Sequence, residues 1–271
     1  MFLVFTLSAC SAIGQTDENN LTDSATSAEK TVSVVRGTIT PTVSTQTTIV
    51  PAVPFIISSP ENGIFNTAVE LEEKITAGQI IGTVNGKELK SPVDGTITSI
   101  APSNESVPSN YPVAIVHYTG FALNVEADNF LSTLPEYAEL KAKFQVYDGV
   151  GPTDMIAVVS PAADENAFTG IVPQEGILQC VISQTVDVKS GQSATVVITA
   201  TTRNDVLILP LSVIAGRQGT GLVTVITPNG ERVETKVTLG VTDGANIEIL
   251  SGLEEGDVVS ATPPNLDPRG I

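Results

Sequence analysis

Short apolar runs, separated by turns rich in Gly, Pro and Asn, follow one another along most of the chain. Runs of this kind predict strands over 142–147, 155–160 and 177–186, and residues 120–127 alternate loosely between apolar and polar side chains. One short helix is expected within 130–140, with Ser132 or Thr133 as its N-cap. The pattern therefore predicts an all-β fold with a minor α part, built from many short strands.

The composition strengthens this prediction and excludes several classes of protein. Val, Thr and Ile make up about a third of the chain, and β-branched residues favour strands. This bias argues against a helical bundle, a long coiled coil and a polytopic membrane protein. The chain has 271 residues, enough for one to three domains, and a net charge of -17, which argues against a nucleic-acid partner.

The N-terminus carries the pattern of a targeting segment. Residues 1–7 are apolar but too few to span a bilayer, and Leu7-Ser8-Ala9-Cys10 follows them. This order is typical of bacterial lipoprotein signals, in which the Cys thiol receives a diacylglycerol, so Cys10 is the predicted lipid-attachment residue. A basic segment before the apolar run is missing, and the alternatives are an ordinary signal peptide with a chance Cys or a disordered end. Residues 11–30 are polar and are expected to form a flexible linker.

An internal repeat predicts a small β module. Ser59-Pro60-Glu61-Asn62-Gly63 recurs 32 residues later as Ser91-Pro92-Val93-Asp94-Gly95, and the apolar run 80–84 recurs as 112–116. One copy cannot bury its apolar face alone, so the two copies are expected to face each other as a flattened sandwich with pseudo-twofold symmetry. Asn85-Gly86 between them is a strong signal for a two-residue hairpin turn.

These residues resemble the biotinyl/lipoyl-like fold. That fold occurs in acyl-carrier modules, whose modified Lys lies on the hairpin between the halves, and in the adaptor proteins of export pumps. Lys87 lies at this hairpin, but the Met residues that flank the Lys in biotin carriers are missing. We therefore interpret Lys87 as an unmodified turn residue and expect no bound cofactor.

Further segments extend the resemblance to adaptor proteins along the chain. The runs 189–198, 205–214, 240–244 and 248–259 are each similar to adaptor segments, and they occur in the same order. The chain thus resembles the periplasmic adaptor, or membrane-fusion protein, family of efflux pumps, close to macrolide-exporter adaptors and more remotely to hemolysin-secretion adaptors. The resemblance implies a lipoyl-like β-sandwich inserted into a β-barrel domain, followed by a β membrane-proximal domain. The implied boundaries are a signal with its lipobox at 1–10, a linker at 11–30, a barrel at 31–53 and 119–202, a lipoyl-like module at 54–118 and a membrane-proximal domain at 203–271. The first strands of the barrel belong either to the barrel alone or to the barrel and the last domain together.

One departure from the family pattern changes the expected partners. Gram-negative adaptors carry a long α-helical hairpin between the two lipoyl halves, and its tip meets an outer-membrane channel. About three residues separate the halves here, too few for a helix. We therefore expect no outer-membrane channel as a partner.

No catalytic set is evident in the sequence. His117 is the one His of the chain, so a His-rich zinc site or a Ser-His-Asp triad would need ligands from elsewhere. Cys180 is expected to be a small core residue. The chain is thus expected to have no enzymatic activity and no metal site.

The resemblance implies a lipid-anchored adaptor on the cell membrane, facing away from the cytoplasm. Its expected partners are an ABC-type permease with its ATPase and further copies of itself in a ring. Candidate partner-interface residues are Leu209, Leu211, Arg217 and Arg232, for which core strand and solvated hairpin are the alternative interpretations. A cell-surface lipoprotein that binds cell-wall glycan or peptide remains the alternative function, and an enzyme is a second rival.

Overall fold

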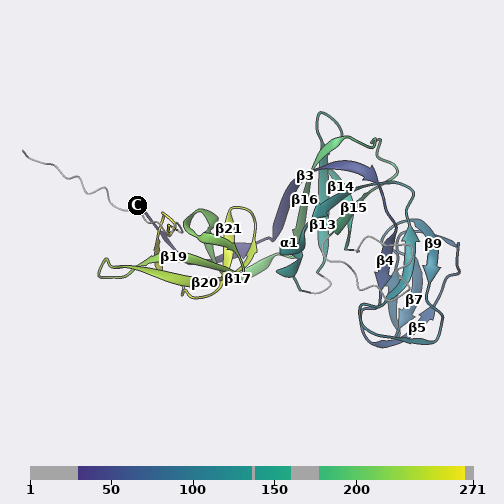
Figure 1. The fold of residues 1–271 in the computed structure, drawn as a ribbon, viewed down its shortest axis with the longest axis horizontal. Coiled ribbons are helices and arrows are strands. Elements are labelled where there is room, and N and C mark those ends of the chain that lie inside the picture. Colours follow the sequence, from purple (N-terminus) through teal and green to yellow (C-terminus); the bar gives the residue numbers. More distant parts are fainter. Residues whose placement is uncertain (1–29, 136–137, 160–176, 266–271) are drawn as a thin grey trace, which may run out of the picture.

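The computed structural model describes residues 30–135, 138–159 and 177–265. Figure 1 shows three β bodies in a row, which we call the terminal sheet, the barrel and the inserted module. This arrangement confirms the predicted fold class: an all-β chain in which a lipoyl-like sandwich is inserted into a barrel and a further β domain follows. Within the described ranges, every helix is too short or too polar to cross a bilayer.

The terminal sheet is built from both ends of the described chain. Its strands, in order across the sheet, are β1 (Thr31–Ser33), β22 (Val258–Ser260), β19 (Thr220–Ile226), β20 (Arg232–Thr242), β21 (Asn246–Ser251), β17 (Arg203–Pro210) and β2 (Val35–Ile39), with β18 (Ala215–Gln218) beside β19 and the 3₁₀ turn η2 (Leu211–Val213) after β17. The consecutive strands β1 and β2 lie at opposite ends of this order, so the chain crosses between them at Val34. Val34 is fully buried, and its N–H donates to the Asp257 carbonyl at 2.8 Å. The first strands, β1 and β2, therefore pair with strands from the C-terminal part of the chain, β22 and β17.

The barrel is a closed ring of six strands. Their order is β12 (Phe121–Glu126), β15 (Ile177–Ile182), β14 (Thr153–Val159), β13 (Leu140–Val146), β16 (Ser193–Ala200) and β3 (Thr42–Pro51). Strand β16 alternates strictly between inward and outward residues, and its inward Val196 and Ile198 are fully buried with Phe144 of β13. Closure of the ring leaves no sheet edge exposed in this body.

One short helix lies beside the barrel, earlier in the chain than the sequence predicted. Helix α1 spans Asp128–Ser132, so Ser132 is its last residue and Thr133 follows its end. The expected N-cap role of Ser132 or Thr133 is wrong: Ala127 occupies the N-cap position and makes no side-chain cap bond. Instead the Thr133 hydroxyl donates back to the Phe130 carbonyl at 2.8 Å. Ser and Thr form such bonds at either end of a helix, so their presence alone did not distinguish the ends.

The inserted module lies between β3 and β12 and consists of two four-stranded sheets. One sheet has the order β10 (Glu105–Val107), β5 (Gly63–Thr67), β7 (Ile80–Val84), β8 (Lys87–Lys90), and the other has the order β4 (Phe55–Ser58), β11 (Pro112–His117), β9 (Gly95–Ile100), β6 (Lys74–Ile75). Adding 32 to the residues of β4, β5, β6 and β7 gives positions within β8, β9, β10 and β11. Exchanging these equivalent strands turns the order β4-β11-β9-β6 into β8-β7-β5-β10, which is the order of the other sheet. The sequence repeat is therefore a structural pseudo-twofold.

Equivalent hydrogen bonds hold the two halves. The buried hydroxyls of Ser59 and Ser91 each donate to the carbonyl two residues later, at 2.6 and 2.7 Å. Asn85 (φ 48°) and Gly86 (φ 83°) form the predicted two-residue turn, which both positive φ values identify as type I′. Apolar residues between the sheets form one continuous core that includes Phe55, Phe65 and Ile97.

Candidate functional site

The junction between the terminal sheet and the barrel is centred on one arginine. The Arg203 guanidinium lies at the start of β17, with Nη1 2.6 Å from Glu248 Oε2, while Nη2 donates to the Thr133 carbonyl at 2.9 Å. The Glu248 side chain is 6 % exposed and that of Arg203 is 29 % exposed. A nearly buried carboxylate of the terminal sheet is thus bound to a cation that also contacts the segment after α1. Gly240 lies directly against this carboxylate, so a side chain at position 240 would collide with Glu248.

The junction between the barrel and the inserted module is held by a buried amide and a buried phenol. The Gln179 side chain, 3 % exposed, accepts from the Val53 N–H at 2.8 Å and donates to the Val53 carbonyl at 3.0 Å. The Tyr118 hydroxyl donates to the Ile182 carbonyl at 2.6 Å. Burial is the main cause that raises the pKa of Tyr118, and the charge of Asp94 adds to it.

Apolar contacts accompany these bonds. Val158 and Val181 point outward from the barrel and are 6 % and 3 % exposed, because they pack into the core of the inserted module. The two connections between the bodies are also joined by a bond from the Ala52 N–H to the Gly120 carbonyl at 2.9 Å. This junction therefore resembles a domain core rather than a flexible linker.

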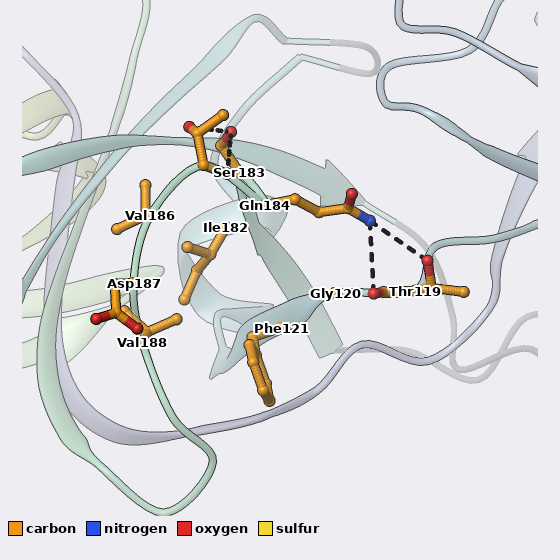
Figure 2. Close-up of a pocket in the computed structure, with 10 residues that line it drawn as sticks. Thr119, Gly120, Phe121, Ile182, Ser183, Gln184, Val186, Asp187 and Val188 are labelled. Atoms are coloured by element: carbon orange, nitrogen blue, oxygen red, sulfur yellow. Dashed lines mark hydrogen bonds between the residues drawn. The ribbon is translucent and has the colours of Figure 1, made fainter.

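A recess of about 440 Å³ lies where residues 183–188 turn away from β15. Figure 2 shows Phe121, Ile182, Val186 and Val188 among its apolar side chains. Among its polar groups, the Gln184 amide donates to the Thr119 hydroxyl at 3.3 Å, and the hydroxyls of Ser183 and Thr185 lie 2.9 Å apart. Asp187 is the one ionisable residue among those that line this recess.

The structure places the two predicted leucines inside the terminal sheet. Leu209 is fully buried in the core, so the core-strand alternative describes its side chain. Leu211 is half-buried in η2 and packs against the same core. Leu209 is thus a core residue of this chain, whereas Leu211 keeps part of its side chain exposed, and their contact with a partner stays a prediction.

The two predicted arginines lie elsewhere in the same sheet. Arg217 falls within β18, and its side chain is outside the described part of the structure. Arg232 is exposed at the start of β20, opposite Ile226 of β19. The structure therefore does not bring the four predicted interface residues together. Cys10 lies outside the described residues.

Sequence reasoning missed the residues on the outward face of the terminal sheet. Ile208 lies between Leu207 and Leu209, pairs with Val35 on one side and with Glu248 on the other, and so points away from the core. Val35 is 48 % exposed and Leu250, two residues after Glu248, is 56 % exposed. The alternation of apolar and polar residues along a strand is the sequence signal for which side chains point outward. In β17 this alternation is absent, because consecutive residues on both faces are apolar.

Lys87 belongs to a hydrogen-bonded cluster at the tip of the inserted module. Its ammonium group pairs with the Glu61 carboxylate, and the Asn85 amide donates to the same carboxylate at 3.1 Å. The bond from Lys87 is the largest cause that lowers the pKa of Glu61, and the bond from Asn85 lowers it further. Lys87 is the first residue of β8, directly after the turn, and its interpretation as an unmodified residue stays a prediction.

His117 and Cys180 lie in separate places. His117 ends β11 beside Gly95, and Cys180 is fully buried in the barrel, where burial raises the pKa of its thiol to about 12. Within the described ranges, no three His, Cys, Asp or Glu side chains gather closely enough to hold a metal ion. In the part of the chain that the structure describes, neither residue therefore belongs to a cluster of metal ligands.

Comparisons with known proteins found similarity in structure alone. No family model matches the chain, and no curated protein matches it. Among solved structures, ZneB from Cupriavidus metallidurans is 14 % identical, with a TM-score of 0.40 and coverage of 89 % of this chain and 94 % of ZneB. MacA from Actinobacillus actinomycetemcomitans is 14 % identical, with a TM-score of 0.38 and coverage of 85 % and 99 %. A MacA–MexA chimera containing the Pseudomonas aeruginosa MexA α-hairpin domain is 14 % identical, with a TM-score of 0.33 and coverage of 83 % and 98 %.

Proposed function

We propose that this protein is a lipid-anchored adaptor subunit of an ABC-type export system, located on the outer side of the cytoplasmic membrane. It binds the membrane permease, assembles with further copies of itself, and guides substrate away from the permease. It stimulates the nucleotide cycle of the ATPase without performing chemistry of its own. Coupling through protein contacts is its whole mechanism.

The order of the three bodies carries this proposal. The described chain begins at Lys30 in the terminal sheet, where the Ala261 N–H donates to the Lys30 carbonyl at 2.8 Å, and the inserted module lies beyond the barrel. A lipid on Cys10 would therefore be tethered to the terminal sheet through residues 11–29. A flexible linker of this length has an end-to-end distance of roughly 25 Å. The anchor would thus hold the terminal sheet nearest the membrane and direct the module away from it.

The tip of the inserted module supports a simpler partnership than that of hairpin-bearing adaptors. Strands β7 and β8 are joined by Asn85 and Gly86 alone, and the neighbouring polar groups bind one another. A tip of this kind has no helix to present to a second channel. We therefore propose that the permease and the membrane suffice as partners and that no outer-membrane channel is involved.

Co-purification tests the proposal. In detergent extracts of the native organism, the protein is expected to co-purify with an ABC permease and to raise its ATPase rate in reconstituted membranes. Lys87→Ala, which changes only the exposed tip, is the matched control and is expected to leave both results unchanged. If the protein purifies alone and its deletion leaves export of every tested compound unchanged, the glycan- or peptide-binding lipoprotein replaces this proposal.

Fractionation tests the anchor separately. Two acyl chains hold a protein on a membrane stably, whereas one chain binds marginally. In a host with the lipoprotein pathway, Cys10→Ala is therefore expected to leave the membrane fraction, while Cys180→Ala is expected to stay. Equal retention of the Cys10 variant would contradict the lipid anchor without affecting the permease result.

A further inference from the structure

A second pocket lies between the inserted module and the barrel. Its volume is about 270 Å³, and both bodies contribute to it. Val93 and the Tyr118 ring, 3 % and 4 % exposed, line one side, and Val181 and Ile156 of the barrel line the other. Ile156 is 42 % exposed and points outward from β14, where it lines this pocket. The pocket thus has a mixed lining, with the polar residues Ser183, Gln184 and Thr185 beside these apolar side chains, and its volume is below that of a typical drug-binding pocket.

One carboxylate, that of the exposed residue Asp94, lines this pocket. Asp94 Oδ1 accepts from the Ala77 N–H at 2.8 Å, and none of the salt bridges between described residues includes Asp94. The charge of Asp94 also adds to the effect of burial that raises the pKa of Tyr118, whose ring lines the pocket. A negative charge beside apolar walls favours a cation with an apolar body, and the net charge of -17 attracts cations to the whole surface.

The pseudo-twofold shows that the turn itself does not need this charge. Asn62 is the equivalent of Asp94 in the other half, and Asn62 Oδ1 accepts from the Ser109 N–H at the same 2.8 Å. Ser109 in turn is the equivalent of Ala77. An amide therefore performs the same structural task at the free tip of the module that a carboxylate performs at the barrel. The charge of Asp94 is available for another use.

A second pocket residue, Val93, also differs from its equivalent in the other half. Glu61 is the equivalent of Val93, and at the tip it is paired with Lys87. Val93 is instead nearly buried and lines the pocket. The half that faces the barrel thus combines an apolar wall with a carboxylate that pairs with no described Lys or Arg, whereas the tip half has a paired charge and a neutral amide.

We propose that this pocket binds a small amphipathic amine, with the ammonium group on the Asp94 carboxylate and the apolar body against Val93, Tyr118 and Ile156. The primary ammonium of such a ligand donates to Asp94 Oδ2, because Oδ1 already accepts from Ala77. This site is independent of the proposed export function, because it rests on the geometry of the junction alone.

Phenethylammonium chloride is the probe, titrated into the full chain and followed by NMR chemical shifts. A ligand of this size in a half-open pocket is expected to bind with a dissociation constant on the order of a millimolar. The largest shifts are expected at Val93, Ile156 and Val181. Its neutral analogue 2-phenylethanol is expected to bind about tenfold more weakly, because it lacks the charge-assisted bond.

Two matched variants separate binding from folding. Asp94→Asn reproduces the residue found at position 62 and is expected to keep the fold while weakening phenethylammonium binding about tenfold. Asn62→Asp places a carboxylate at the tip and is expected to leave the affinity unchanged. Equal affinity of Asp94→Asn and the unaltered chain, equal affinity for the neutral analogue, or no saturable shifts up to about 20 mM probe would each overturn the proposal.

Discussion

Gly95→Val is expected to destabilise the inserted module strongly. Gly95 is not among the described glycines with a positive φ, so the reason for glycine at this position is the close approach of the neighbouring strand. A Cβ at this position would lie 2.5 Å from Val116 Cγ1 and 2.9 Å from the His117 carbonyl oxygen. Nonbonded carbon atoms prefer about 3.5–4.0 Å, so the overlap is about 1 Å before the two methyl groups of valine are added.

The surroundings of Gly95 cannot relax easily. Val116 is fully buried, and the His117 carbonyl belongs to the backbone of β11, which pairs with β9. Overpacking of this kind typically lowers the free energy of unfolding by about 1–3 kcal/mol. Because backbone is among the contacted atoms, the expected loss for Gly95→Val is about 3 kcal/mol. This loss corresponds to about a hundredfold more frequent opening of the module.

Hydrogen exchange measures the effect where it occurs. Amides of β9 and β11 are expected to exchange about a hundredfold faster in the variant, while barrel amides far from the junction change little. Gly63→Val is the matched control from the other half. Its added atoms meet the exposed side chain of Asn85 instead of buried backbone, so about 1 kcal/mol is expected. Equal exchange in the two variants would refute the close-approach argument.

Three further predictions concern buried polar groups. Gln179→Leu leaves both backbone groups of Val53 without their partner, so the free energy of unfolding is expected to fall by about 2–3 kcal/mol. Small-angle scattering is expected to show greater freedom of the inserted module. Unchanged scattering and stability would contradict the role of this amide. Arg203→Gln removes the cation from the nearly buried Glu248, so the free energy of unfolding in denaturant melts is expected to fall by about 2 kcal/mol. Solvent at the partly exposed Arg203 keeps this loss below that of a fully buried pair. The double variant with Glu248→Gln should recover part of the lost stability. Cys180 is expected to resist iodoacetamide at pH 8 until the protein unfolds, because burial raises its pKa to about 12 and leaves the thiol protonated. Rapid labelling of the native protein at pH 8 would contradict this resistance to iodoacetamide. Because the thiol of the unfolded chain loses its proton near pH 9, the same shift lowers the stability of the folded state as pH rises from about 9 to 12.

The sequence by itself determined the parts of the fold that depend on neighbouring residues. Asn-Gly between two apolar runs specified the type I′ turn at Asn85, because few other dipeptides accept two positive φ values. The repeat predicted the two halves of the module, since equal sequences at a fixed spacing fold into equal units. The abundance of β-branched residues predicted the all-β class.

The tertiary structure decided which side chains face the core and which form the junctions. Leu207, Ile208 and Leu209 are equally apolar, and only the packing of the terminal sheet shows that Ile208 points outward. Gln179 contacts Val53 across 126 positions of the chain, so no local pattern could reveal their bond. The pocket beside Asp94 likewise exists only where two bodies meet, because its walls come from strands that no short-range preference brings together.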